Sequence, residues 1–295
     1  MEFDMAAPGF ERILPPDSRL EIIAHDLAFG EGPVWNRRTG ELFWVNIIGD
    51  TIWKWKPGVG KSIVMKPCYK ADGMTFDREG RLVVAGWAWR NVWRMEHDGT
   101  IRILCSHYEG KKLNTPNDIV VKSDGSIYFT DPSGALYNVA MHGEDVQRYL
   151  DFHGVFRIAP DGTTTLVVRD FVYPNGLAFS PDESLLYVND TRLGLIRVFD
   201  VRPDGSVANS RVFYKAVGTE PGVPDGMKVD VEGNVYCTGP AGVHVISPEG
   251  RLLGRIRIPG HTTNFAWGDD DWRGMYFTTY TSVFKLRLGI PGVAV

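Results

Sequence analysis

Short apolar runs alternate with turn residues along this chain. In the stretch 223–239, a polar residue and a glycine precede the apolar run Met227–Val229. Glu232-Gly233 then separates this run from a second one, which ends at Thr238-Gly239. Such a pattern predicts a strand, a tight turn and a second strand.

The same pattern occurs six times, the last copy being looser than the others. We call the polar residue that opens each copy a head residue; the heads are Glu31, Asp72, Asn117, Asn175, Asp225 and Thr263. Successive heads are 41, 45, 58, 50 and 38 residues apart. A third apolar run follows each pair, and in five copies a turn and a fourth run come next. Four strands repeated at this period are typical of β-propeller blades.

We therefore predict an all-β fold, a six-bladed β-propeller in which each blade is a four-stranded antiparallel sheet. The last repeat has no fourth strand after Leu286, and the apolar segment Leu20–His25 precedes the first repeat. We expect this N-terminal strand to close the last blade, so that the ring has no exposed sheet edge. Residues 1–18 are expected to form an N-terminal arm, and residues 19–295 a single propeller domain.

Composition excludes several classes of partner. The 295 residues are 43% hydrophobic and 12% aromatic, which is enough for a large core, and a net charge of −4 gives no electrostatic case for nucleic acid. No apolar run approaches the ~20 residues of a membrane span. The N-terminus lacks a secretion signal, and three cysteines without a Cys-x-x-Cys motif suggest buried thiols in a reducing cytoplasm. The sequence predicts no particular oligomeric state.

Blade geometry gathers the head residues at one place. The first strand of a propeller blade lies at the central channel, so we expect the heads to surround one mouth of that channel. The connections from second to third strand, and from fourth strand to the next head, lie on the same face. The two longest connections, residues 132–154 and roughly 206–224, are therefore predicted to build up this face, as a ligand site requires.

The head residues offer oxygen ligands. Carboxylates and amides, with no His or Cys among them, suit a hard cation such as calcium, which accepts about 6–8 oxygens. The alternative is that each Asp or Asn before a glycine is an ordinary turn residue. Five polar side chains at equivalent positions favour the cation, because like charges at one mouth repel each other unless a positive charge balances them.

The head motifs Glu31-Gly32-Pro33, Pro116-Asn117-Asp118, Pro174-Asn175-Gly176 and Pro224-Asp225-Gly226 resemble those of a known family. It is the senescence-marker-protein/gluconolactonase/luciferin-regenerating-enzyme family, here its gluconolactonase-like branch, and the resemblance extends from about Leu20 to Leu286. It implies a six-bladed propeller with one divalent metal ion at the channel mouth. Calcium is expected first, with zinc, manganese or magnesium as alternatives.

The resemblance also implies roles for individual residues. Glu31, Asn175 and Asp225 would be metal ligands, and Asn117 would be a fourth ligand or a substrate contact. Asp225 would in addition be the catalytic base or nucleophile. Many sugar-lactone members carry an arginine two residues before the third head, where this chain has Thr115, so we leave the sugar specificity open and treat Thr115 as a candidate substrate contact.

Further candidate substrate contacts come from the same face. Trp87 and Trp89 follow the second strand of the second repeat, and they could line a pocket or pack under the 132–154 loop. Tyr137 and His142 lie within that loop and could contact substrate.

The first functional hypothesis is a metal-dependent hydrolase that opens a small-molecule lactone to its hydroxy acid. The metal would polarise the carbonyl and Asp225 would activate water. One alternative is a phosphotriesterase that uses the same metal site. Another is a non-enzymatic ligand-binding propeller, which would need no metal.

Overall fold

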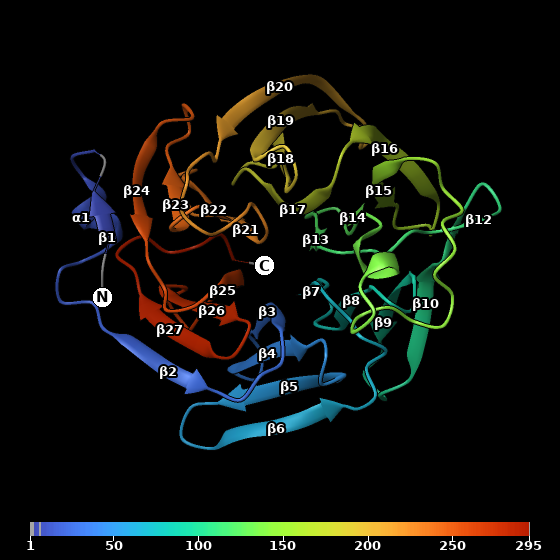
Figure 1. The fold of residues 1–295 in the computed structure, drawn as a ribbon, viewed down its shortest axis with the longest axis horizontal. Coiled ribbons are helices and arrows are strands. Elements are labelled where there is room, and N and C mark those ends of the chain that lie inside the picture. The colour runs from blue at the N-terminus through green and yellow to red at the C-terminus, as the bar shows by residue number, and fades with distance from the viewer. Residues whose placement is uncertain (1–2, 6, 295) are drawn as a thin grey trace.

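The structure is a computed structural model that describes residues 3–5 and 7–294. In this part of the chain, six antiparallel blades form a ring around a central channel (Figure 1). Each blade contains four strands in sequential order, except that the last one takes its outer strand from the N-terminus. The predicted six-bladed all-β propeller is therefore confirmed.

The first three blades follow the predicted repeats. Blade 1 contains β3 (Gly30–Asn36), β4 (Glu41–Asn46), β5 (Thr51–Lys56) and β6 (Gly60–Met65). Blade 2 contains β7 (Met74–Phe76), β8 (Leu82–Gly86), β9 (Asn91–Met95) and β10 (Ile101–Cys105). Blade 3 contains β13 (Ile119–Val121), β14 (Ile127–Asp131), β15 (His153–Ile158) and β16 (Thr164–Phe171). A small hairpin, β11 (His107–Tyr108) and β12 (Lys111–Lys112), and the 3-10 helix η1 (Gly134–Tyr137) lie in the connections.

The other three blades complete the ring. Blade 4 contains β17 (Pro174–Phe179), β18 (Leu185–Asp190), β19 (Leu195–Val201) and β20 (Val207–Lys215). Blade 5 contains β21 (Met227–Val229), β22 (Val235–Gly239), β23 (Gly242–Ile246) and β24 (Leu252–Ile256). Blade 6 contains β25 (Thr262–Gly268), β26 (Gly274–Thr279) and β27 (Val283–Arg287). Because β20 occupies the first half of the predicted 206–224 connection, that loop is shorter than expected.

The N-terminal strand closes the ring as predicted. β2 (Leu20–Ala24) pairs with β27 in antiparallel register, with Leu20 opposite Leu286 and Ile22 opposite Phe284. The strand ends one residue before His25. Blade 6 is thus completed by a strand that lies more than 250 positions before its partner β27 in the sequence (Figure 1).

The segment before β2 adds a feature that the sequence did not indicate. β1 (Phe3–Met5) pairs with β24 as a fifth strand of blade 5, and the short helix α1 (Phe10–Ile13) follows. Phe10 and Ile13 are buried in the cluster between blades 5 and 6. This packing is irregular and hence has no repeat signal to reveal it.

The core lies between the blades, and the second strands are its most buried elements. β8 is buried along its whole length, and so are β14 and β22. A middle strand is covered by neighbouring blades on both faces, which explains its continuous apolar run in the sequence. No helix among residues 3–5 and 7–294 is long and apolar enough to cross a membrane.

Candidate functional site

The head residues meet around the channel because the inner strands start very close together. The Gly73 amide donates a 2.8 Å hydrogen bond to the Asn117 carbonyl of the next blade, and Gly176 donates one of 3.1 Å to Asp225. A Cβ added at Gly73 would lie 2.5 Å from the Asn117 carbonyl oxygen, and one at Gly176 would lie 2.2 Å from that of Asp225. At these two heads, the glycine that follows is therefore required for the blades to approach each other.

Glu31 is held in a fixed position at the start of blade 1. Its side chain is 4% exposed, and its Oε2 accepts hydrogen bonds from the Gly32 amide at 2.8 Å and from Asn264 Nδ2 at 3.1 Å. Asn264 follows the head of blade 6, so two neighbouring blades fix this carboxylate.

Asn175 presents an amide oxygen that lacks a partner. Its Nδ2 donates to Thr191 Oγ1 at 3.1 Å, and the Thr191 hydroxyl in turn donates to the Pro224 carbonyl at 2.6 Å. Asn175 Oδ1 is buried and has no hydrogen-bond partner in the described part of the chain. A buried acceptor without a partner requires an explanation, and an unplaced ion is one of the ordinary ones.

Asn117 is oriented by the head of the preceding blade. Its Nδ2 donates a 2.6 Å hydrogen bond to Asp72 Oδ2, and both residues are buried. Because the amide nitrogen is bound to Asp72, the amide oxygen is left for another partner. This leaves that oxygen free for the role of metal ligand or substrate contact that the resemblance implies for Asn117.

Buried carboxylates in this region raise each other's pKa. Burial, followed by the charge of Glu31, raises the pKa of Asp72 and of Asp225 well above the usual range. Burial also raises the pKa of Glu31 to about 7, and the charge of Asp118 contributes. Like charges that raise each other's pKa are stabilised by a nearby cation. A cation at these head residues would offset this repulsion.

The donor set is mixed rather than purely acidic. Among the described residues, no three His, Cys, Asp or Glu side chains are grouped so that they could hold a metal ion. The predicted set contains two carboxylates, Glu31 and Asp225, and two amides, Asn117 and Asn175. The unpartnered oxygen of Asn175 and the raised carboxyl pKa values fit an oxygen-ligated cation, so these residues could hold the ion that the sequence resemblance implies.

Two of the candidate substrate contacts lie together. Trp89 stacks on Tyr69 with ring centroids 4.3 Å apart, and it lines a cavity of about 430 Å³ together with His142. Lys70 and Lys112 also line this cavity, which lies between blade 2 and the 132–154 loop.

The other candidates have different surroundings. Thr115 is fully buried, and its hydroxyl donates a 2.5 Å hydrogen bond to the Pro132 carbonyl. Trp87 is buried in a cluster that includes Ala135 of the 132–154 loop. Tyr137 is 68% exposed. These three side chains are not among those that line the cavity shared by Trp89 and His142.

Two tyrosines near the head residues were missed from the sequence. Burial, followed by the charge of Asp225, raises the pKa of both Tyr173 and Tyr280. Tyr173 directly precedes Pro174-Asn175, and Tyr280 directly follows the second strand of blade 6. Tyr280 also stacks on His261 with centroids 4.6 Å apart. For Tyr173, its place next to a head motif was the available signal; Tyr280 lies next to no head motif.

The chain is similar to known proteins over most of its length. The SMP-30/gluconolactonase/LRE-like region matches residues 29–281. The chain belongs to this family. Within it, a gluconolactonase of Zymomonas mobilis is 32% identical over 304 residues, which span 95% of this chain and 84% of that protein.

Solved structures of the SMP-30/gluconolactonase/LRE-like family share the fold. A gluconolactonase of Xanthomonas campestris superposes with a TM-score of 0.90 at 31% identity, covering 98% of this chain and 95% of that one. A regucalcin of Agrobacterium tumefaciens, described as a calcium-binding protein, superposes with a TM-score of 0.75 over 93% and 94% of the two chains. At 19% identity, the second likeness shows the fold alone.

Proposed function

We propose that this protein is a metal-dependent lactonase that opens a small sugar lactone to its hydroxy acid. The similarity to gluconolactonases over nearly the whole chain supports a lactone-hydrolysing function. Within the structure, the observation that supports the proposal is the cluster of head residues. Glu31, Asn117 and Asn175 are buried and Asp225 is half-buried, and Glu31 lies close enough to Asp225 for its charge to raise the pKa of that carboxyl group.

Glu31, Asn175 and Asp225 would hold the metal ion, with Asn117 as a fourth ligand or a contact to the substrate. A bound divalent ion would polarise the lactone carbonyl and stabilise the developing oxyanion. Calcium is expected first because every proposed donor is an oxygen. Zinc prefers nitrogen and sulfur ligands, and manganese and magnesium remain alternatives.

Asp225 is proposed to activate the attacking water. Its backbone is held on both sides, since its amide donates to Thr238 Oγ1 at 2.7 Å and its carbonyl accepts from Asn189 Nδ2 at 2.7 Å. The raised pKa of its carboxyl group makes it a stronger base than an ordinary aspartate. The water proton would pass to Asp225 as oxygen bonds to the carbonyl carbon. The ring C–O bond would then break, and the departing oxygen would take up the proton.

Aromatic side chains would shape the substrate site. Tyr173 and Tyr280 lie close enough to Asp225 for its charge to raise their pKa. A Cβ at Gly134 would collide with the Tyr173 hydroxyl, so η1 packs directly on this ring. We propose that the two tyrosines bound the lactone, while Trp89 and His142 line the approach to it.

A substrate panel tests the proposal. Purified protein supplied with calcium would be assayed on glucono-1,5-lactone, a pentonolactone, an alkyl γ-lactone and a phosphotriester. We expect kcat/KM to be highest for the sugar lactones. A higher kcat/KM for the phosphotriester would favour a phosphotriesterase, and no turnover of any compound would favour a binding propeller.

A further inference from the structure

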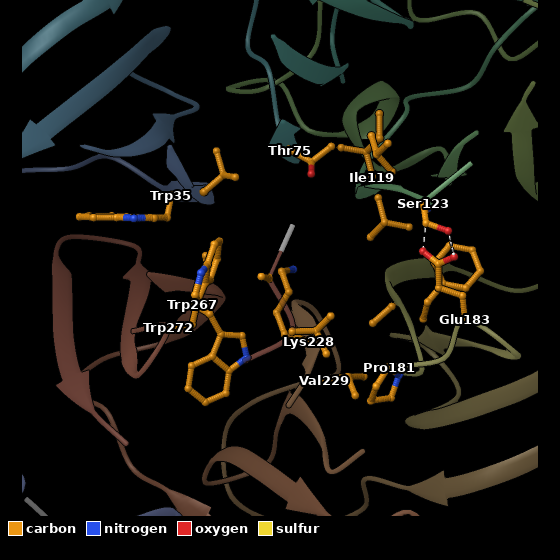
Figure 2. Close-up of a pocket in the computed structure, with 18 of the residues that line it drawn as sticks. Trp35, Thr75, Ile119, Ser123, Pro181, Glu183, Lys228, Val229, Trp267 and Trp272 are labelled. Atoms are coloured by element: carbon orange, nitrogen blue, oxygen red, sulfur yellow. Dashed lines mark hydrogen bonds between the residues drawn. The ribbon is translucent and has the colours of Figure 1, made fainter. Parts of the chain in front are cut away.

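A second cavity lies at the other end of the channel from the head residues. It has a volume of about 400 Å³, and Figure 2 shows Lys228 extending into it from β21. The residues three positions after the six heads all line it, namely Val34, Thr75, Val120, Ala178, Lys228 and Ala266. Five of these side chains are uncharged and no larger than valine. Lys228 is therefore the exception in this layer.

The Lys228 ammonium group turns toward the head residues. Its Nζ donates to the Met227 carbonyl at 3.0 Å and to Asn264 Oδ1 at 3.4 Å, and it lies 3.8 Å from Asp118 Oδ2. Asp118 and Asn264 directly follow the heads of blades 3 and 6, where the other four blades have glycine. Lys228 thus contacts both of the polar side chains in the layer immediately behind the heads.

Asn264 transmits this contact to Glu31. Its Oδ1 accepts hydrogen bonds from Lys228 and, at 2.9 Å, from the Phe265 amide. With the oxygen so engaged, its Nδ2 is directed at Glu31 Oε2, 3.1 Å away. A continuous hydrogen-bonded chain therefore runs from the Lys228 ammonium to a proposed metal ligand.

Asp118 needs a counter-charge. It is 3% exposed, and its Oδ2 has no hydrogen-bond partner within the described residues. Its Oδ1 accepts a 2.8 Å hydrogen bond from the Ile119 amide. A buried carboxylate oxygen without a partner is costly, and an ammonium 3.8 Å from Oδ2 offsets part of that cost.

We propose that Lys228 is the internal counter-ion of the carboxylates at and next to the head residues. This inference rests on the proposed function, because it takes Glu31 as a metal ligand. Its ammonium stabilises the buried carboxylates while no metal is bound, and through Asn264 it positions Glu31. Because like charges repel, the same ammonium opposes the binding of a divalent cation. Lys228 is a positioning residue, and it sets the affinity of the site for metal.

Two substitutions at position 228 test this inference. Lys228→Met keeps most of the side-chain length and removes the charge, whereas Lys228→Arg keeps the charge. Thr75→Val is the matched control, because Thr75 lies in the same layer and carries no charge. Each protein would be depleted of metal, its Tm measured, and its calcium Kd determined by calorimetry.

For Lys228→Met we expect a metal-free Tm several degrees below that of the wild type. We also expect its calcium Kd to be about tenfold lower, which is the same free energy as a shift of roughly one pKa unit. Lys228→Arg and Thr75→Val should stay close to wild type in both quantities. If Lys228→Met folds only when calcium is present, that result supports the inference, because the metal then replaces the lost charge.

Other results would overturn the inference. Lys228→Met with an unchanged metal-free Tm and an unchanged or weaker calcium affinity would show that Lys228 only fills the channel. A Lys228→Arg protein that matched Lys228→Met would exclude charge as the cause. If wild-type protein hydrolysed lactones without binding any metal, the proposed metal dependence would fail, and the metal-free Tm would still decide the stabilising role of Lys228.

Discussion

At the scale of single residues, the two carboxylates among the proposed ligands are expected to differ in role. Glu31→Gln keeps an oxygen donor but loses a charge, so calcium affinity should fall and high calcium should restore much of the rate. Asp225→Asn cannot take up a proton, so kcat should drop about 10²–10⁴-fold even with calcium saturating. Titrating kcat against calcium for both variants measures the contrast. Near wild-type turnover of Asp225→Asn at saturating calcium would refute the assignment.

The raised pKa of Asp131 leads to a prediction about how stability depends on pH. Burial raises its pKa to about 7, against 3.8 ordinarily, and its Oδ1 has no partner among the described residues. Between pH 4 and 7 the folded protein retains this proton and the unfolded chain does not. The free energy of unfolding therefore falls as pH rises through this window, by up to about 1.4 kcal/mol per pH unit.

Asp131→Asn resembles the protonated form and should remove this contribution. Urea unfolding of both proteins at pH 5 and pH 7 measures the difference in slope. We expect the variant to lose less stability than wild type between the two pH values. Equal losses would contradict the shifted pKa.

The residues that the sequence predicted belong to a local pattern, whereas the residues that it missed make contacts between blades. The heads could be read from the sequence because each opens a local strand–turn–strand pattern that recurs six times. Lys228 and Asn264 could not, because their contact crosses from one blade to the next and their positions in the repeat usually hold small residues. A pattern within one repeat does not show which residues of different blades meet in the ring.

At the scale of elements, Arg90 holds the 132–154 loop against the start of blade 3. It is 2% exposed, and its guanidinium donates to the carbonyls of Leu113, Asn114, Asp145 and Gln147 at 2.7–3.2 Å. The sequence predicted that this loop builds up one face of the propeller. The sequence did not indicate that Arg90 holds the loop in place, because the atoms that accept its hydrogen bonds are backbone carbonyls.

Arg90→Lys should therefore loosen the loop. A lysine cannot supply donors to four carbonyls in two directions, and each buried acceptor left unpaired costs about 1–3 kcal/mol. We expect a lower Tm and faster proteolytic cleavage between residues 138 and 150. Arg94→Lys is the control, because Arg94 lies in the adjoining β9 and pairs with Glu96 near the surface. Equal effects of the two substitutions would argue against the role of Arg90 in holding the loop.

At the scale of the whole molecule, the ring depends on its N-terminal strand. Deleting residues 1–26 removes β2 and exposes the edge of β27, so the protein should aggregate or unfold far below the wild-type Tm. Deleting residues 1–8 removes β1 but keeps the buried Phe10 and Ile13. Its effect on Tm should be much smaller. Similar effects of both deletions would contradict the role of β2 in closure.

The overall architecture was predictable because each blade of a propeller repeats the same sequence pattern at a similar spacing. Six copies of one pattern and one missing strand determine the ring and its closure. The added strand β1 and helix α1 were not predictable, because they occur once and lie outside the repeats. The surroundings of the candidate substrate contacts were hidden for the same reason, since these residues come from connections that differ between blades.

The most direct test of the central claim is the rate of glucono-1,5-lactone hydrolysis by metal-depleted protein, measured before and after calcium is added, with metal content checked by elemental analysis. We predict that chelation reduces the rate to the uncatalysed level and lowers Tm, and that calcium restores both, since a ligand that binds only the folded state stabilises it. Full activity in protein shown to contain no metal would contradict the account.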